Sequence, residues 1–76
     1  MQKIIKVIPC DGYILKIYLS DAQCFVIDMN QKIHTLRFAG LNDQKVFSAV
    51  NTDGKAIYWS DGTSMSIAEV LEMRKN

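Results

Sequence analysis

Fifteen residues, from Lys55 to Glu69, restrict the fold of this chain more than any other segment. Residues 56–60 are rich in aromatic and β-branched side chains, including the only tryptophan, which is typical of a strand. The Asp-Gly pair that follows favours a tight turn, because glycine tolerates a positive φ. Ser66 and Glu69 match the capping box that begins a helix. The segment therefore predicts a strand, a turn, a short extended piece and then a helix.

The N-terminal part of the chain predicts three more strands. Residues 3–9, 13–19 and 24–29 are rich in β-branched and aromatic side chains, and polar residues interrupt them at the spacing of a pleated strand. Short turn sequences at residues 9–12 and 20–23 separate them. Three strands joined by short turns form an antiparallel meander.

The segment of residues 30–43 is the least regular part of the sequence. Asn30 can cap a single helical turn. Asn42 or Asp43 can cap a short helix that extends to about Ala49, and a hairpin then leads into the strand at residues 56–60. The apolar side chains expected to face the core from this middle region are Leu36, Phe38, Leu41, Val46, Phe47 and Val50.

The final helix is expected to run from Ile67 to about Met73, with Arg74 and Lys75 in its last turn, where they complement the helix dipole. Its apolar residues Ile67, Val70 and Leu71 are expected to face inward. The order β-β-β-α-β-β-α predicts an α+β fold, an antiparallel sheet with two short helices on one face. We expect a single domain over residues 1–76, because 76 residues leave no room for a second core.

Composition excludes several classes of protein. Hydrophobic residues make up 49% and charged residues 22% of the chain, which is typical of a globular domain. A net charge of +1 argues against a strongly basic nucleic-acid binder. No apolar run approaches the roughly 20 residues of a membrane helix, and Lys3, Lys6 and Pro9 interrupt the N-terminal apolar run. The expectation is a cytoplasmic domain of bacterial type.

The sequence predicts no catalytic, cofactor-binding or metal-binding residues. Cys10 and Cys24 stand alone and are expected to be reduced, small and half-buried side chains. His34 is the only histidine, so a zinc site has too few ligands, and no local motif supports a reactive Cys–His pair. We expect His34 to be an ordinary surface or half-buried residue.

Most of the acidic residues are expected to serve turns, where a short carboxylate bonds nearby backbone N–H groups; they are Asp11, Asp21, Asp53 and Asp61. Asp28 ends a strand just before the irregular segment. It can cap that turn, and contact with a ligand is the alternative. Trp59 is interpreted as an anchor of the core, although a binding role for it stays open.

Lysines interleaved with tyrosines suggest a second class of function. Lys3, Lys6, Lys16 and Lys55, with an exposed tyrosine, could form a single-strand nucleic-acid platform. Adjacent side chains on a strand point to opposite faces, so at most one of Tyr58 and Trp59 can join such a platform.

Several segments carry a pattern that is similar to a known family. They are Ile5-x-Val7, Tyr13-x-Leu15-x-Ile17, Phe25-x-Ile27-Asp28-Met29, Phe38-x-x-Leu41-x-Asp43, Phe47-x-x-Val50, Ile57-x-Trp59-x-Asp61-Gly62 and Met65-x-x-x-Glu69-x-Leu71. In their order and spacing, which span essentially the whole chain, they resemble the domain of unknown function 2442 family. The chain departs from that family at Ala22, Ser60 and Ser64, where the family often has Gly, Pro and Asp. A role that rests on that Asp is not carried over.

The resemblance implies a small bacterial or phage-type α+β domain, sometimes fused to a DNA-binding helix-turn-helix. It also implies an accessory or antitoxin-like partner of a small neighbouring protein. No helix-turn-helix is recognised in these 76 residues, so direct operator binding is not implied. Together with the lack of a catalytic motif, this predicts a non-catalytic protein-interaction module whose partner is another protein or a second copy that completes a sheet.

Overall fold

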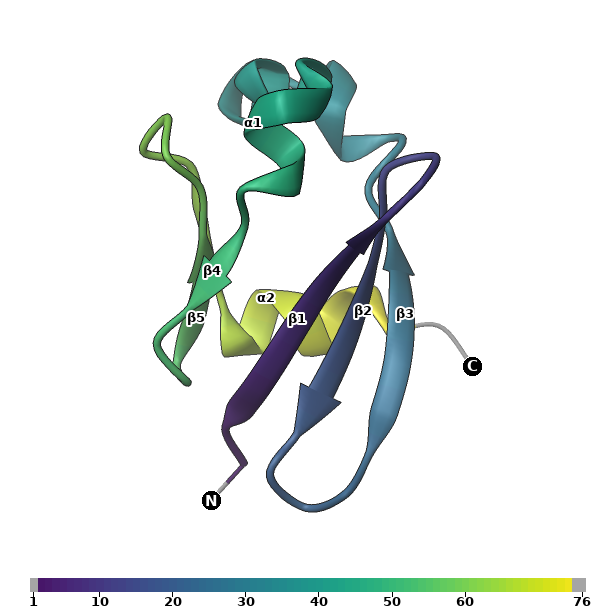
Figure 1. Ribbon diagram of the computed structural model, residues 1–76, viewed down its shortest axis with the longest axis vertical. Helices are drawn as coiled ribbons and strands as arrows, with labels where there is room; N and C mark the ends of the chain where they lie inside the picture. Colours follow the sequence, from purple (N-terminus) through teal and green to yellow (C-terminus); the bar gives the residue numbers. More distant parts are fainter. Residues whose placement is uncertain (1, 75–76) are drawn as a thin grey trace.

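The computed structural model, which describes residues 2–74, contains two antiparallel sheets of three strands each (Figure 1). The first sheet has the order β1-β2-β3, and the second has the order β4-β5-β6. Their bounds are Ile4–Cys10, Ile14–Leu19 and Cys24–Asp28 in the first sheet, and Asn51–Thr52, Ala56–Tyr58 and Ser64–Ser66 in the second. The mixed α+β class is confirmed, but the prediction of one sheet is wrong.

Alternation of side chains builds the first sheet as expected. Leu15, Ile17 and Leu19 of β2 are fully or almost fully buried, while the residues between them are half-buried on the outer face. Strand β2 begins one residue later than predicted because Tyr13 has a φ of 61°, in the left-handed region. The turn after β2 places Ala22 at a φ of 72°, a conformation that suits glycine better.

The middle region forms three short helices at one end of the molecule (Figure 1). Two are 3₁₀ helices, η1 (Lys32–His34) and η2 (Leu36–Asn42), and one is the α-helix α1 (Gln44–Ser48). Of the two predicted caps of α1, Asn42 and Asp43, it is Asp43 whose side chain accepts a hydrogen bond from the backbone N–H of Lys45 at 2.9 Å. The prediction that Leu36 faces the core is wrong, because Leu36 begins η2 and is 96% exposed.

The second sheet is separate because it meets β1 through a turn. The N–H of Ile4 donates to the C=O of Gly54 at 2.9 Å, and a register shift between Ile4 and Lys6 interrupts the edge of β1 there. Strand β4 has only two residues, too few to continue the first sheet. The short extended piece predicted between the turn and the last helix is a third strand, β6, in which Met65 is buried.

The last helix, α2 (Ile67–Met73), begins at the predicted capping box. The Ser66 hydroxyl accepts from the N–H of Glu69, and the Glu69 carboxylate accepts from the N–H of Ser66. The helix lies across the inner face of the first sheet, whereas α1 lies at one end of the molecule (Figure 1). The prediction of two helices on one face is therefore wrong. Lys75 lies outside the described residues.

One core joins both sheets. Trp59 is 3% exposed, and its indole N–H donates to the C=O of Phe47 at 3.0 Å, so its interpretation as a core anchor is confirmed. The buried residues of this core are Ile4, Leu15, Ile17, Leu19, Ile27, Met29, Ile33, Phe38, Leu41, Phe47, Val50, Ile57, Trp59, Met65 and Val70. Because α2 and the second sheet cover only the inner face of the first sheet, its outer face is left to solvent.

Candidate functional site

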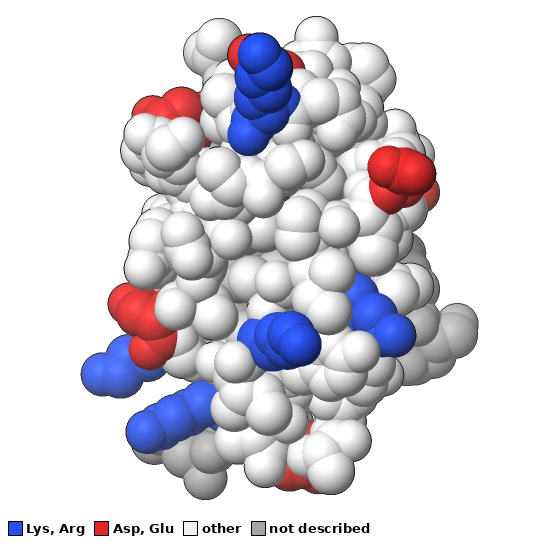
Figure 2. Space-filling model, viewed as in Figure 1, with Lys and Arg blue, Asp and Glu red and all other residues white. Residues whose placement is uncertain are grey.

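The outer face of the first sheet is an uncharged surface interrupted by separate charged side chains (Figure 2). Its apolar and aromatic members are Ile8, Ile14, Tyr18 and Val26, which are half-buried or exposed. The side chain of Val26 is 58% exposed, a large fraction for a β-branched residue in a strand. An uncovered apolar sheet face of this kind is a surface that a partner can use.

Two lysines flank the aromatic residue of this face. The Nζ atoms of Lys6 and Lys16 lie 6.0 and 5.4 Å from the centre of the Tyr18 ring. Both distances are within the range of a cation–π interaction. The two other lysines of the predicted platform do not join them: Lys55 belongs to the turn between β4 and β5, and Lys3 lies beside Gly54 of that turn.

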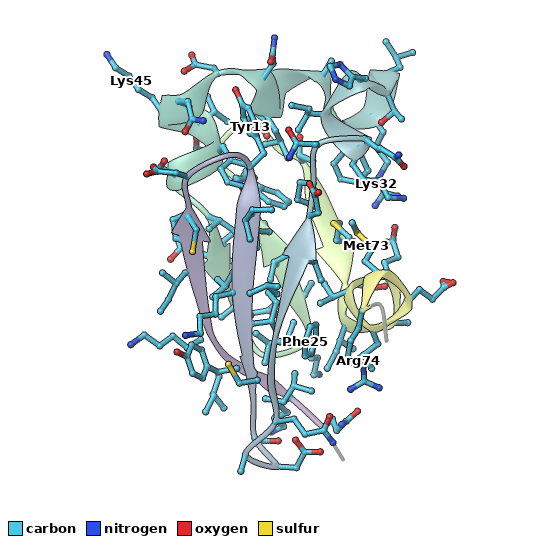
Figure 3. All side chains as sticks on the ribbon, turned by 90° about the vertical axis from the view of Figure 1, so that its right-hand side faces the viewer. Tyr13, Phe25, Lys32, Lys45, Met73 and Arg74 are labelled. Atoms are coloured by element: carbon cyan, nitrogen blue, oxygen red, sulfur yellow. The ribbon has the colours of Figure 1, made fainter. Side chains whose placement is uncertain are left out.

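A groove of about 710 Å³ runs beside the free edge of β3. Figure 3 looks onto this edge, with Lys32 of η1 and Met73 of α2 on the same side of the strand. The lining residues are Ile14, Val26, Asp28, Gln31, Lys32, Thr35, Glu72 and Met73. The groove mixes apolar side chains with charges of both signs.

The backbone of β3 presents unpaired groups along this edge. At the two ends of the β2–β3 pair, Gln23 accepts from Leu19 and Met29 donates to Tyr13, so the odd-numbered residues of β3 face β2. In an antiparallel pair the intervening residues point the other way. The N–H and C=O groups of Cys24, Val26 and Asp28 therefore point outward, and among residues 2–74 they have no hydrogen-bond partner.

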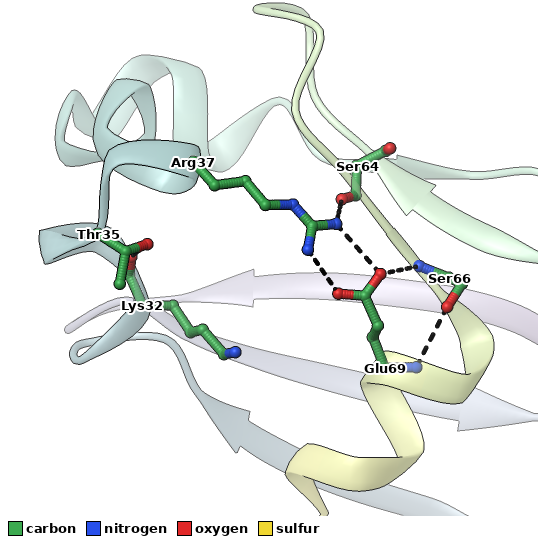
Figure 4. A network of polar contacts seen from close by, with 6 residues as sticks. All are labelled: Lys32, Thr35, Arg37, Ser64, Ser66 and Glu69. Carbon is green, nitrogen blue, oxygen red and sulfur yellow. Dashed lines mark hydrogen bonds and ion pairs between the residues drawn. The ribbon is translucent and has the colours of Figure 1, made fainter.

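Polar side chains close the corresponding edge of β6 (Figure 4). Arg37 donates to the C=O of Ser64 at 2.7 Å and makes a bidentate pair with Glu69 at 2.7 and 3.1 Å. Glu69 in turn accepts from the outward N–H of Ser66. The Arg37 guanidinium, and then the Ser66 N–H, lower the pKa of Glu69 below its ordinary value. This network holds η2, β6 and α2 together and has a structural role.

Asp53 and Asp61, two of the acidic residues that the sequence assigned to turns, act as expected. Asp61 accepts from the N–H of Thr63 at 2.9 Å, and Asp53 accepts from the N–H groups of Lys55 and Ala56. These backbone bonds lower the pKa values of both aspartates. The two carboxylates therefore stabilise turns.

Asp28 combines a turn role with a place on the groove. Its carboxylate accepts from the backbone N–H of Asn30 at 2.8 Å and from the Asn30 side chain at 2.7 Å, and these bonds lower its pKa. The predicted capping role is confirmed. Asp28 also lines the groove beside β3.

The remaining sequence candidates stay apart from one another. His34 is exposed at the end of η1. Cys10 and Cys24 are free and exposed, so the prediction that they are half-buried is wrong. Within residues 2–74 no group of three or more His, Cys, Asp or Glu residues could hold a metal ion. In the same part of the chain, no helix is long and apolar enough to cross a membrane.

Comparison of the chain with protein families, with curated proteins and with solved structures finds no match. The resemblance to the domain of unknown function 2442 family therefore stays a prediction. The candidate site consists of the outer face of the first sheet and the free edge of β3 with its groove. The sequence reasoning missed this edge, although the strand Cys24–Asp28 itself was expected.

Proposed function

We propose that this chain is a non-catalytic protein-interaction module, an accessory or antitoxin-like partner of a protein encoded near it. The observation that carries the proposal is the free edge of β3 beside the uncovered outer face of the first sheet. A sheet edge supplies main-chain hydrogen bonds to a bound segment, and the adjacent side chains supply selectivity.

The composition of the outer face supports this function. Ile8, Ile14 and Val26 provide apolar area, and Tyr18 provides an aromatic ring held between two lysines. Interface centres are enriched in aromatic side chains and poor in acidic ones. Asp28 is at the rim of this face, where its carboxylate is already bonded to Asn30.

Co-expression with each protein encoded beside this chain tests the proposal. A stable complex should co-purify, and Tyr18→Ala should weaken its affinity by about ten-fold or more, as loss of an aromatic anchor does. Tyr58→Ala is the matched control, because Tyr58 is 42% exposed but belongs to the second sheet. A chain that captures no neighbour and stays monomeric, or equal losses from the two variants, would count against this function.

A nucleic-acid-binding accessory domain is the second candidate, and the two lysines around Tyr18 favour it. The base of a single strand could stack on Tyr18 while Lys6 and Lys16 contact phosphates. Binding should then weaken steeply with salt, and Lys6→Gln with Lys16→Gln should flatten that dependence. A mobility-shift assay with single-stranded DNA and RNA at low salt tests it. No shift there removes this candidate.

A further inference from the structure

The edges of the two sheets are not equally protected. Natural sheets blunt their edges with proline, bulges, short strands or covering groups, because a free edge pairs with other chains. On β1, from Lys6 to Cys10, the even-numbered residues face β2, so Pro9 points outward and offers no N–H there. The outward N–H of Ile4 is already bonded to Gly54, and the register shift lies next to it.

The second sheet is protected as well. On β6, Arg37 bonds the outward C=O of Ser64, and Glu69 bonds the outward N–H of Ser66. Strand β4 is two residues long. Among the strands of residues 2–74, β3 is therefore the one whose outward backbone groups are neither blunted nor bonded.

Apart from the charge of Asp28 at its end, the sequence of β3 contains none of the features that protect an edge. Cys24–Asp28 has no lysine, proline or glycine, and its register with β2 runs without a shift from Cys24 to Asp28. Its central residue, Val26, is 58% exposed beside the groove. An unprotected, regular and apolar strand edge is a surface built for pairing.

We propose that β3 pairs with β3 of a second copy of this chain, antiparallel, about a two-fold axis through Val26. The first sheets of the two copies then form one six-stranded sheet. Val26 lies opposite Val26 of the second copy, and Cys24 lies opposite Asp28. The outward groups of these three residues supply about six inter-strand hydrogen bonds, two for each facing pair. This inference rests on the proposed function, because it names one protein partner of the same edge.

The free edge of β3 is self-complementary, and this identifies its partner as a second copy of the chain. An isologous contact places one residue on the axis, and only an axis at Val26, the middle residue of Cys24–Asp28, pairs every residue of β3 with another residue of β3. An axis at Asp28 would place two carboxylates opposite each other, which is destabilising. An axis at Cys24 would place Val26 opposite Ala22, whose φ of 72° lies outside the strand region. Only an axis at Val26 uses the whole strand and opposes no like charges.

The groove provides space for this pairing. A neighbouring strand lies roughly 4.8 Å away in the direction of the hydrogen bonds. The groove of about 710 Å³ is lined by Val26 and Asp28 of this strand. On the outer face, the apolar surfaces of the two copies become continuous through the Val26 pair.

Sedimentation analysis of the full chain tests the proposal. At high concentration, we expect a mass twice the 8.6 kDa of one chain. Val26→Lys should raise the dissociation constant of the dimer by at least about ten-fold, because it opposes two lysines at the axis. Ile5→Lys is the matched control, since Ile5 is 64% exposed on β1 and should leave the dimer unchanged. Circular dichroism checks that both variants are folded.

Cysteine cross-linking tests the register. With Cys10 and Cys24 replaced by serine, Val26→Cys should form a disulfide-linked dimer rapidly, because facing residues have Cα atoms about 5.5 Å apart, within the range of a disulfide. Native Cys24, with Cys10 replaced, should not cross-link, because the two copies of Cys24 would be roughly 13 Å apart at 3.3 Å per residue.

Three results would overturn the proposal: a monomer at every concentration, cross-linking through Cys24 in preference to Val26→Cys, or equal effects of Val26→Lys and Ile5→Lys. The proposed function fails separately. A chain that stays monomeric but still binds a neighbouring protein keeps that function, and loss of this binding in Val26→Lys would assign the edge to a strand of the other protein.

Discussion

Replacement of Trp59 by alanine is expected to lower the free energy of unfolding by about 3–5 kcal/mol, the range for a buried aromatic ring. The ring is 3% exposed and stacks on Phe47 with 6.4 Å between ring centres. Its indole N–H also satisfies the C=O of Phe47, which is the residue that ties α1 to the core. Small domains have about 5–15 kcal/mol of stability in total, so the variant should be largely unfolded.

Urea unfolding followed by far-ultraviolet circular dichroism measures this effect, since the variant has no tryptophan to report by fluorescence. Tyr58→Ala is the control, because Tyr58 is adjacent in the chain but 42% exposed. Tyr58→Ala should lower the free energy of unfolding by less than about 1 kcal/mol, as is usual for surface positions. If Trp59→Ala stayed folded and instead lost a protein partner, the Trp59 region would be a binding site.

Local patterns predicted much of this fold because they depend on residues close together in the chain. The capping box of Ser66 and Glu69 placed the beginning of α2 correctly, and the cap of Asp43 placed α1. The strands Ile4–Cys10, Ile14–Leu19 and Cys24–Asp28 followed from their apolar alternation to within one residue at either end. Each of these features depends on residues that lie only a few positions apart in the sequence.

The arrangement of the elements could not be predicted in the same way. The contact between the two sheets includes the bond from Ile4 to Gly54, and the protection of β6 depends on the pair of Arg37 with Glu69. These partners are far apart in sequence, and neither contact has a local signature. The exposure of Leu36 likewise follows from where η2 begins against the rest of the molecule.

The candidate site was missed for a related reason. The sequence predicted the strand that contains Val26 but not which sheet edge would stay free. That outcome depends on where β1 and β6 find their covering groups, Gly54 for one and Arg37 for the other. The lack of lysine and proline in Cys24–Asp28, against Pro9 in the first strand, is the one sequence signal that could have identified the edge.

Glu69→Ala is expected to cost about 1–2 kcal/mol of stability because Glu69 serves two structures at once. Loss of a helix cap costs about 0.5–2 kcal/mol, and an ion pair as exposed as this one adds at most about 1 kcal/mol. The side chains of Arg37 and Glu69 are 53% and 35% exposed, so the cap should dominate. Glu72→Ala, on the same helix and with the same change of charge, is the control and should cost no more than about 0.5 kcal/mol.

The pH dependence of the stability separates the contribution of the Glu69 carboxylate charge from that of the rest of the side chain. Arg37 first, and then the Ser66 N–H, lower the pKa of Glu69 in the folded chain below its ordinary value of 4.5. A lowered folded pKa means that the stabilisation is present above the unfolded pKa and is lost as pH falls through the folded pKa. The stability difference between the native chain and Glu69→Ala should therefore be full at neutral pH and shrink in acid.

Urea unfolding of both chains at neutral pH and at several acidic values measures this difference. Glu69→Gln should keep part of the cap, because its amide oxygen can still accept from Ser66, but it should lose the charge-dependent part. A difference that stays constant into acid would show that the carboxylate charge contributes nothing. Equal costs for Glu69→Ala and Glu72→Ala would show that the network of Arg37, Glu69 and Ser66 does not hold α2 against β6.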